Sequence, residues 1–151
     1  MIAEKIIEKM GIELPEASAP AAMYLPLVQT GNLIFVSGQI PKTSEGLITG
    51  KVGDTVTLEE AQEAARICTI NGIAALKAYL GDLDKIKKIV KLQAFVASKT
   101  GFDQQHLVAN GASQLLFDIF GEAGRHARTA VSVNQLPMDA TIEIEFIVEV
   151  E

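Results

Sequence analysis

The chain has 151 residues, of which 48% are hydrophobic and 21% charged, and its formal net charge is −6. This length favours one domain with a substantial core, and no apolar run approaches the roughly 20 residues that span a bilayer. The negative charge disfavours nucleic acid as a partner, because phosphate contacts need clustered lysines and arginines. The mean hydropathy of +0.26 is high for so small a chain, so we expect apolar surface to be buried between subunits.

The first residues predict a short helix and then an irregular connector. Apolar residues at helical spacing favour a helix over Ile2–Met10 that ends at Gly11, and two prolines interrupt Glu13–Ala22. Acidic residues within this start argue against a signal peptide. The single cysteine, Cys68, excludes an intrachain disulfide and fits a reducing cytoplasm. We therefore expect a cytoplasmic protein with one domain over residues 1–151, in which residues 1–22 form an N-terminal helical extension and connector.

The rest of the chain alternates between strand and helix patterns. Thr57-Leu58-Glu59-Glu60 predicts a capping box at the start of a helix that stops at Gly81. The other predicted elements are strands at Tyr24–Gln29, Leu33–Ser37, Ile86–Ala97, Ala127–Asn134 and Thr141–Val150, a loop with a short strand at Gly38–Asp54, and a helix at Phe102–Phe120. This order predicts an α/β (α+β) fold, a mixed sheet with two long helices on one face. The uncovered face is expected to pack against other subunits.

Several kinds of site are disfavoured by the residue spacing. His106 and His126 stand twenty residues apart with no partner at ligand spacing, so no metal site is predicted. His106, near a helix start, is expected to be exposed or capping. Cys68 lies on the apolar side of the first long helix, which favours a buried small hydrophobe over a nucleophile. A basic run is expected to be a solvated face; it consists of Lys85, Lys87, Lys88 and Lys91.

An arginine and a glutamate near the C-terminus remain as candidates. Arg128 opens a β-patterned run, and Glu143 belongs to a strand that alternates apolar and acidic residues. Arg128 is either a snorkelling side chain or a bidentate binder of a substrate carboxylate, and Glu143 is either solvated or able to activate a water. A simple hairpin about Pro137 would place Arg128 opposite roughly residue 147. Spacing alone therefore does not bring Arg128 and Glu143 together.

Two segments resemble a known family. GNLIFVSGQIP (Gly31–Pro41) and RHARTAVSVNQLPMDATIEIE (Arg125–Glu145) resemble the RidA family, also called the YjgF or L-PSP endoribonuclease family. The resemblance extends over nearly the whole chain from Tyr24 onward. The N-terminal helix and the phrase VANGASQLLFDIFGEAGRHAR are similar to a longer branch of that family.

The resemblance implies a chorismate-mutase-like fold, a homotrimer with clefts between subunits, and deamination of reactive enamines and imines without a cofactor. Arg128 matches the arginine that binds the substrate carboxylate, and Glu143 matches the glutamate that positions the attacking water. Tyr24 matches a tyrosine that lines the pocket. Asn110 is one residue out of register with an asparagine that contributes in some members. The sites of the family draw on more than one subunit. Glu149 and Glu151 are expected to be solvated.

Three functions follow as hypotheses. The first is a hydrolase, an enamine/imine deaminase that converts 2-imino (2-amino-alkenoic) acids to 2-oxo acids and ammonia. The second is a non-catalytic trimer that binds small carboxylates. The third is an endoribonuclease of the L-PSP type. It is the weakest of the three, because the net charge of −6 and the lack of basic residues interleaved with aromatic ones disfavour RNA binding.

Overall fold

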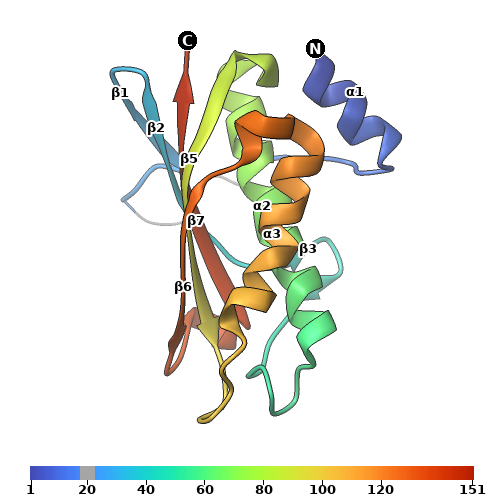
Figure 1. Cartoon of the computed structure of the whole chain (residues 1–151), viewed down its shortest axis with the longest axis vertical. Helices are drawn as coiled ribbons and strands as arrows, with labels where there is room; N and C mark the ends of the chain where they lie inside the picture. The colour runs from blue at the N-terminus through green and yellow to red at the C-terminus, as the bar shows by residue number, and fades with distance from the viewer. Residues whose placement is uncertain (18–22) are drawn as a thin grey trace.

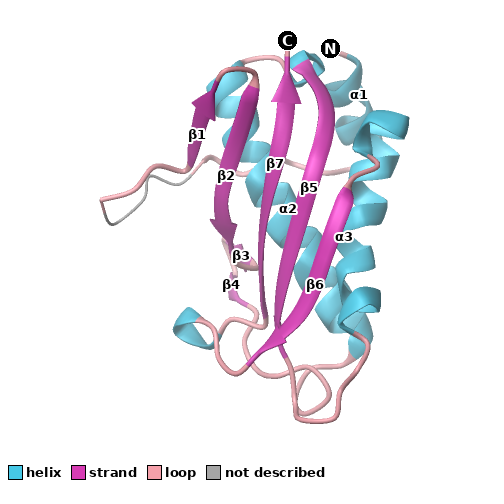
Figure 2. Cartoon of the chain, turned by 60° about the vertical axis from the view of Figure 1, so that its left-hand side comes forward, coloured by secondary structure: helices cyan, strands magenta, loops and turns pink. Residues whose placement is uncertain are grey.

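The computed structural model describes residues 1–17 and 23–151 of the chain. At its centre lies a five-stranded sheet in the order β1-β2-β7-β5-β6, which Figure 2 shows face-on. Its strands are Leu27–Thr30 (β1), Leu33–Gln39 (β2), Ile86–Ala97 (β5), Ala127–Val133 (β6) and Ile142–Val150 (β7). β5 and β6 are parallel whereas the other neighbours are antiparallel, so the sheet is mixed. Lys42–Thr43 (β3) and Gly46–Leu47 (β4) form a separate short hairpin.

Helices cover one face of this sheet. The two long ones, Leu58–Leu80 (α2) and Gln105–Phe120 (α3), lie side by side against it in Figure 1. The α+β fold predicted from the sequence, with two long helices on one face of a mixed sheet, is therefore confirmed. The described residues also include three 3-10 turns: Leu83–Lys85 (η1), Gly121–Gly124 (η2) and Pro137–Asp139 (η3).

The long helix α2 begins and packs for reasons visible in single residues. Thr57 Oγ1 accepts a hydrogen bond from the Glu60 amide at 3.1 Å, and Glu60 Oε2 accepts one from the Thr57 amide at 3.3 Å, which confirms the predicted capping box. Gly72, in mid-helix, faces the fully buried ring of Phe146 on β7. A Cβ at Gly72 would lie 2.4 Å from that ring, so the glycine lets α2 pack closely on the sheet.

The C-terminal strands do not form a hairpin. β5 lies between β6 and β7, with Leu92 of β5 aligned with Arg128 on one side and with Phe146 on the other. The chain therefore does not form the simple hairpin about Pro137 that would place Arg128 opposite roughly residue 147. Parallel pairing of β5 with β6 depends on α3, which connects the two strands and carries the chain back across the sheet.

Several element boundaries differ from those predicted, and two element starts differ most. The first strand begins at Leu27 rather than Tyr24, because Pro26 has no amide to donate, although its carbonyl accepts from the Ser37 amide at 2.9 Å. α3 begins at Gln105 rather than Phe102, since Phe102 closes a turn through its amide to the Lys99 carbonyl. Part of the predicted connector Glu13–Ala22 lies outside the described residues.

The sheet face opposite the helices carries exposed apolar side chains. Val28 of β1, Phe35 of β2 and Val131 of β6 are 51%, 43% and 41% exposed, and all three belong to the parity that points away from the helices. An uncovered face of this kind fits the expected burial between subunits. The homotrimer itself stays a prediction.

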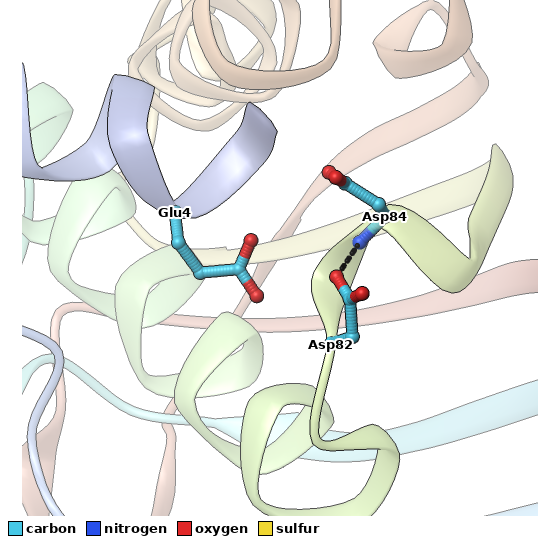
Figure 3. A group of neighbouring side chains, drawn as sticks. All are labelled: Glu4, Asp82 and Asp84. Carbon is cyan, nitrogen blue, oxygen red and sulfur yellow. Dashed lines mark hydrogen bonds between the residues drawn. The ribbon is translucent and has the colours of Figure 1, made fainter. Parts of the chain in front are cut away.

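The N-terminal helix, Ile2–Lys9 (α1), is anchored by acidic side chains (Figure 3). Asp84 accepts the amides of Ile2 and Ala3 at 2.5 and 2.9 Å, while Glu4 accepts the Leu83 amide and the Lys77 ammonium at 2.8 and 3.0 Å. Asp82 caps η1 through the Asp84 amide at 2.9 Å. Glu4, Asp82 and Asp84 therefore form an acidic cluster whose role is structural, since its hydrogen bonds hold α1 and η1 in place. No helix among the described residues is both long and apolar enough to span a membrane.

Candidate functional site

Arg128 is held by two side chains of α3. Its NH1 donates to Asn110 Oδ1 at 2.8 Å and to Ser113 Oγ at 3.1 Å. Asn110 and Ser113 are three residues apart, so they lie on the same face of the helix, next to the start of β6. Both hydrogens of NH1 are thereby engaged. A carboxylate ligand would accept hydrogen bonds from Nε and NH2, which form the remaining edge of the guanidinium.

A cleft of about 420 Å³ opens beside Arg128, between α3, η2 and β6. We call it the arginine cleft; its wall includes Asn110, Ser113, Phe117, Arg125, His126 and Arg128. None of the described residues that line it is acidic, and two are arginines. The exposed ring of Phe117 adds an apolar surface. The cleft therefore suits a small anion with an apolar part.

His126 is locked into this wall by both ring nitrogens. Nε2 lies 2.9 Å from Ser113 Oγ and Nδ1 lies 2.7 Å from the carbonyl oxygen of Gly124. Burial lowers the pKa of His126 below 6.5, and the charge of Arg128 acts in the same direction, against the hydrogen bond to Gly124. A Cβ at Gly124 would lie 2.2 Å from the Leu116 carbonyl oxygen. Only glycine lets this turn pack so closely on α3.

A second cleft, about 630 Å³, surrounds Glu143. We call it the glutamate pocket; its wall includes Tyr24, Gly38, Gln39, Asn71, Met138 and Glu143. Glu143 is half-buried, and this burial raises the pKa of its carboxyl above 4.5, with the neighbouring charge of Glu145 adding to the effect. A carboxylate with a raised pKa exchanges protons more readily near neutral pH, which is the property of a general base.

Gly38 makes room for the Glu143 side chain. A Cβ at Gly38 would lie 2.6 Å from Glu143 Oε2 and 2.9 Å from its Cδ. Gly38 also sits where the pairing of β2 with β7 shifts its register, between Val36 and Gln39. The glycine of the Ser-Gly-Gln-Ile-Pro segment thus has a physical role at the glutamate pocket.

The other walls of the glutamate pocket are held by hydrogen bonds to the backbone. Ser37 Oγ donates to the Leu25 carbonyl at 2.6 Å, which fixes the segment that carries the half-exposed Tyr24. Asn71 of α2 donates to the carbonyls of Ile40 and Lys42 at 3.1 and 3.0 Å, which fixes the chain after Gly38. These contacts connect three separate parts of the chain at one cleft.

The turn at η3 contributes a strained backbone to the same pocket. Met138 and Asp139 both have positive φ, 57° and 59°, an unfavourable region for side chains other than glycine and asparagine. Met138 is 67% exposed and lines the glutamate pocket together with Pro137. Two consecutive strained residues beside Glu143 are typical of a functional loop.

The structure brings together Arg128 with Asn110, and Tyr24 with Glu143, but it does not bring the two pairs together within one chain. Arg128 points to the helix side of the sheet, where α3 binds it. Glu143 alternates with Ile142 and Ile144, which are buried against the helices, so its side chain lies on the opposite face. β5 separates their strands.

The remaining sequence candidates behave as structural residues. Cys68 is fully buried, and burial raises the pKa of its thiol, so the structural interpretation is confirmed. His106 is exposed, as expected. The expectation that Glu149 is simply solvated is wrong, because it is half-buried, accepts from Asn32 Nδ2 at 3.2 Å and lies 3.7 Å from Lys87 Nζ.

Comparisons with known proteins agree with this architecture. Residues 4–150 match the family described as YjgF/chorismate mutase-like, putative endoribonuclease. Protein TCP17 of Trypanosoma cruzi is 47% identical over 145 residues, 95% of this chain and 91% of that protein. A 2-iminobutanoate/2-iminopropanoate deaminase of Escherichia coli K12 is 35% identical over 132 residues, 86% of this chain and 91% of that protein. The crystal structure of Atu1372, a protein of unknown function from Agrobacterium tumefaciens, superimposes with a TM-score of 0.93 at 46% identity, covering 99% and 93% of the two chains.

The chain belongs to the YjgF/chorismate mutase-like family, and its fold is the one the resemblance implied. Sequence reasoning missed Ser113, Asn71 and the packing roles of Gly38 and Gly124. Their partners lie far along the chain, and periodicity carries no signal for such contacts. His126 lies two residues before Arg128 in the sequence, but its hydrogen bond to Ser113, thirteen residues away, is visible only in three dimensions.

Proposed function

We propose that this protein is an enamine/imine deaminase, which hydrolyses 2-imino acids to 2-oxo acids and ammonia. The observation that carries the proposal is the pre-oriented Arg128, whose NH1 donates to Asn110 and Ser113 and whose side chain lines a cleft without acidic lining residues among those described. Kinship with the E. coli 2-iminobutanoate/2-iminopropanoate deaminase at 35% identity supports the same chemistry.

The complete site, in this proposal, joins the arginine cleft of one subunit to the glutamate pocket of its neighbour in a homotrimer. Two features support the joining. Arg128 and Glu143 lie on opposite faces of their own sheet, so one chain cannot place both on a small substrate. Exposed apolar residues on the uncovered sheet face, such as Phe35 and Val131, would be buried by a neighbouring subunit.

The reaction consumes one water and requires no cofactor. Arg128 binds the carboxylate and so orients the electrophilic imine carbon. Glu143 takes a proton from a water as its oxygen bonds to that carbon, giving a tetrahedral carbinolamine. Glu143 returns that proton to the nitrogen of the carbinolamine. The carbinolamine hydroxyl then gives its own proton, through Glu143, to the same nitrogen as the C–N bond breaks, so that ammonia leaves and the carbon becomes the carbonyl of the 2-oxo acid. Tyr24 and Asn110 serve in substrate binding, Asn110 through Arg128.

A direct assay tests this function. 2-Iminopropanoate or 2-iminobutanoate is generated in situ by an amino-acid oxidase, and its decay to the 2-oxo acid is followed with and without the protein. Accelerated decay that disappears in Arg128→Ala supports the proposal. Decay at the uncatalysed rate contradicts it.

A second candidate, a non-catalytic trimer that binds small carboxylates, is favoured by one observation. The arginine cleft is organised within a single chain and does not depend on Glu143. Binding of pyruvate without any imine hydrolysis would select this candidate. The family's description as a putative endoribonuclease gives a third, which cleavage of RNA by the purified protein would support.

A further inference from the structure

A continuous chain of hydrogen bonds runs from Arg128 to the backbone. Arg128 NH1 lies 3.1 Å from Ser113 Oγ, Ser113 Oγ lies 2.9 Å from His126 Nε2, and His126 Nδ1 lies 2.7 Å from the Gly124 carbonyl oxygen. Ser113 and His126 are both half-buried, whereas Arg128 and Asn110 are exposed. The most protected part of the cleft wall is therefore the part behind the arginine.

The chemistry of each group fixes the direction of these bonds. A carbonyl oxygen only accepts, so His126 Nδ1 carries the proton that faces Gly124. In a neutral imidazole the other nitrogen, Nε2, is then an acceptor, and the hydroxyl of Ser113 donates to it. The Ser113 oxygen keeps its lone pairs for the N–H of Arg128. Each donor has one acceptor, and the burial that lowers the pKa of His126 favours this neutral form.

We propose that Ser113 and His126 are positioning residues for Arg128, which hold its guanidinium so that the Nε and NH2 edge faces the substrate carboxylate. The inference rests on the proposed function, in which Arg128 binds that carboxylate. It extends the site to two residues that act on the substrate through Arg128.

Asn110 alone does not fix the guanidinium. One hydrogen bond to NH1 leaves the planar group free to tilt about that contact, and Asn110 is itself exposed. The second acceptor, Ser113, lies one helical turn further along α3 and defines the plane. His126 in turn orients the Ser113 hydroxyl, which would otherwise rotate freely and offer its hydrogen to the arginine side.

Gly124 anchors the last hydrogen bond of this series to the backbone of the fold. Its carbonyl is the final acceptor, and its Cα lies so close to α3 that a side chain would meet the Leu116 carbonyl at 2.2 Å. The helix that carries Ser113 and the turn that orients His126 are thus packed directly together. The positions of serine, histidine and arginine are fixed relative to one another by the backbone.

Pyruvate binding by calorimetry tests the inference without any reaction. The variants are Ser113→Ala, Ser113→Thr, His126→Phe and the double variant Ser113→Ala/His126→Phe. We expect each single loss to weaken pyruvate binding by about threefold to tenfold, because a hydrogen bond that orients a charged group is removed. The double variant should bind no more weakly than the worse single one, since the two residues act as one chain. Ser113→Thr, which keeps the hydroxyl, should bind within about twofold of wild type.

A matched control and a second readout separate positioning from structure. Ser132→Ala breaks a Ser98–Ser132 hydrogen bond of 2.6 Å on the same strand as Arg128 and should leave pyruvate binding unchanged. In the imine assay, Ser113→Ala and His126→Phe should each raise KM and change kcat little. Nuclear magnetic resonance of the imidazole nitrogens reports the tautomer of His126. The His106→Gln variant identifies which signals belong to His126, and these should show the tautomer protonated at Nδ1.

The outcomes distinguish this inference from the proposed function. If Arg128→Ala binds pyruvate as well as wild type, the function assigned to the arginine is wrong. If Arg128→Ala fails to bind while Ser113→Ala and His126→Phe bind normally, or their effects simply add, the positioning role is wrong and the function stands. A proton on Nε2 of His126 would also overturn the inference, and that measurement requires no variant to fold.

Discussion

The arginine cleft and the glutamate pocket are built in contrasting ways. Regular elements and neutral hydrogen-bond partners fix the first, so that its cation is oriented before any ligand arrives. Loops, a register shift and two strained residues build the second, around a carboxylate whose pKa is raised by burial. A preorganised cation suits binding, whereas a desolvated acid suits proton transfer. In the proposed function, the arginine cleft therefore recognises the substrate and the glutamate pocket carries out the reaction.

The largest expected effect comes from the acid of the glutamate pocket. Glu143→Gln keeps the shape of the side chain but removes its basicity, so kcat should fall by about 100-fold while pyruvate affinity stays close to wild type. Steady-state kinetics and calorimetry measure both. Glu149→Gln, on the same face of β7, is the matched control and should change neither.

The pH dependence of the same residue sharpens this assignment. Because Glu143 must be ionised to accept a proton, kcat should decline as pH falls through its pKa, which lies above 4.5, and Glu143→Gln should lack that decline. The folded state binds this proton more tightly than the unfolded state, so Glu143 costs stability above its folded pKa. Glu143→Gln should therefore raise Tm at pH 7 and not at pH 3. A lower Tm at pH 7 would contradict the burial of an unfavourable charge.

Arg128 should show the opposite kinetic pattern. Arg128→Ala removes a bidentate ionic contact, so kcat/KM and pyruvate affinity should each fall by at least about tenfold. Arg128→Lys should restore little, since an ammonium cannot reproduce the fork. Arg66→Ala, which removes an arginine of α2 that lies 3.7 Å from Glu63, is the control. Full activity in Arg128→Ala would mean that the side chain only covers apolar surface.

A smaller effect on kcat is expected when the space that Gly38 leaves for the Glu143 side chain is filled. Gly38→Ala places a methyl group against the end of a flexible carboxylate, which moves at little cost in stability. We expect kcat to fall by about threefold to tenfold with Tm almost unchanged, because a displaced base loses its geometry. Gly111→Ala is the contrasting variant, since its Cβ would lie 2.1 Å from the Gln62 carbonyl oxygen, and it should lower Tm. Unchanged kcat in Gly38→Ala would show that the position of Glu143 does not limit the rate.

The smallest effect on activity is predicted for Cys68. Cys68→Ala leaves both clefts intact and should not alter kcat/KM, while the lost packing should cost roughly 1 kcal/mol of stability. Denaturant unfolding and the imine assay measure the two quantities. Loss of activity in a folded Cys68→Ala would reveal a role that its burial does not suggest.

Features that depend on residues close together in the sequence were predicted correctly, whereas contacts between distant residues were not. The capping box at Thr57 and the bounds of β5, Ile86–Ala97, were predicted correctly because both depend on neighbouring residues. The insertion of β5 between β6 and β7 was not, since local periodicity does not specify which strands pair. Arg128 and Glu143 were candidates from the residue patterns alone, but only the resemblance gave them specific roles. Their separation onto two faces of the sheet came only from the structure.

Mixing two inactive variants tests whether each site is shared between two subunits. Arg128→Ala and Glu143→Gln subunits are unfolded together, refolded at equal ratio and assayed for imine hydrolysis. If each site takes Arg128 from one subunit and Glu143 from its neighbour, about one quarter of the sites regain both residues, and the mixture recovers roughly that share of wild-type activity. Activity no greater than the mean of the two separate variants, in a mixture shown to contain hybrid oligomers, would show that Arg128 and Glu143 of neighbouring subunits do not form one site.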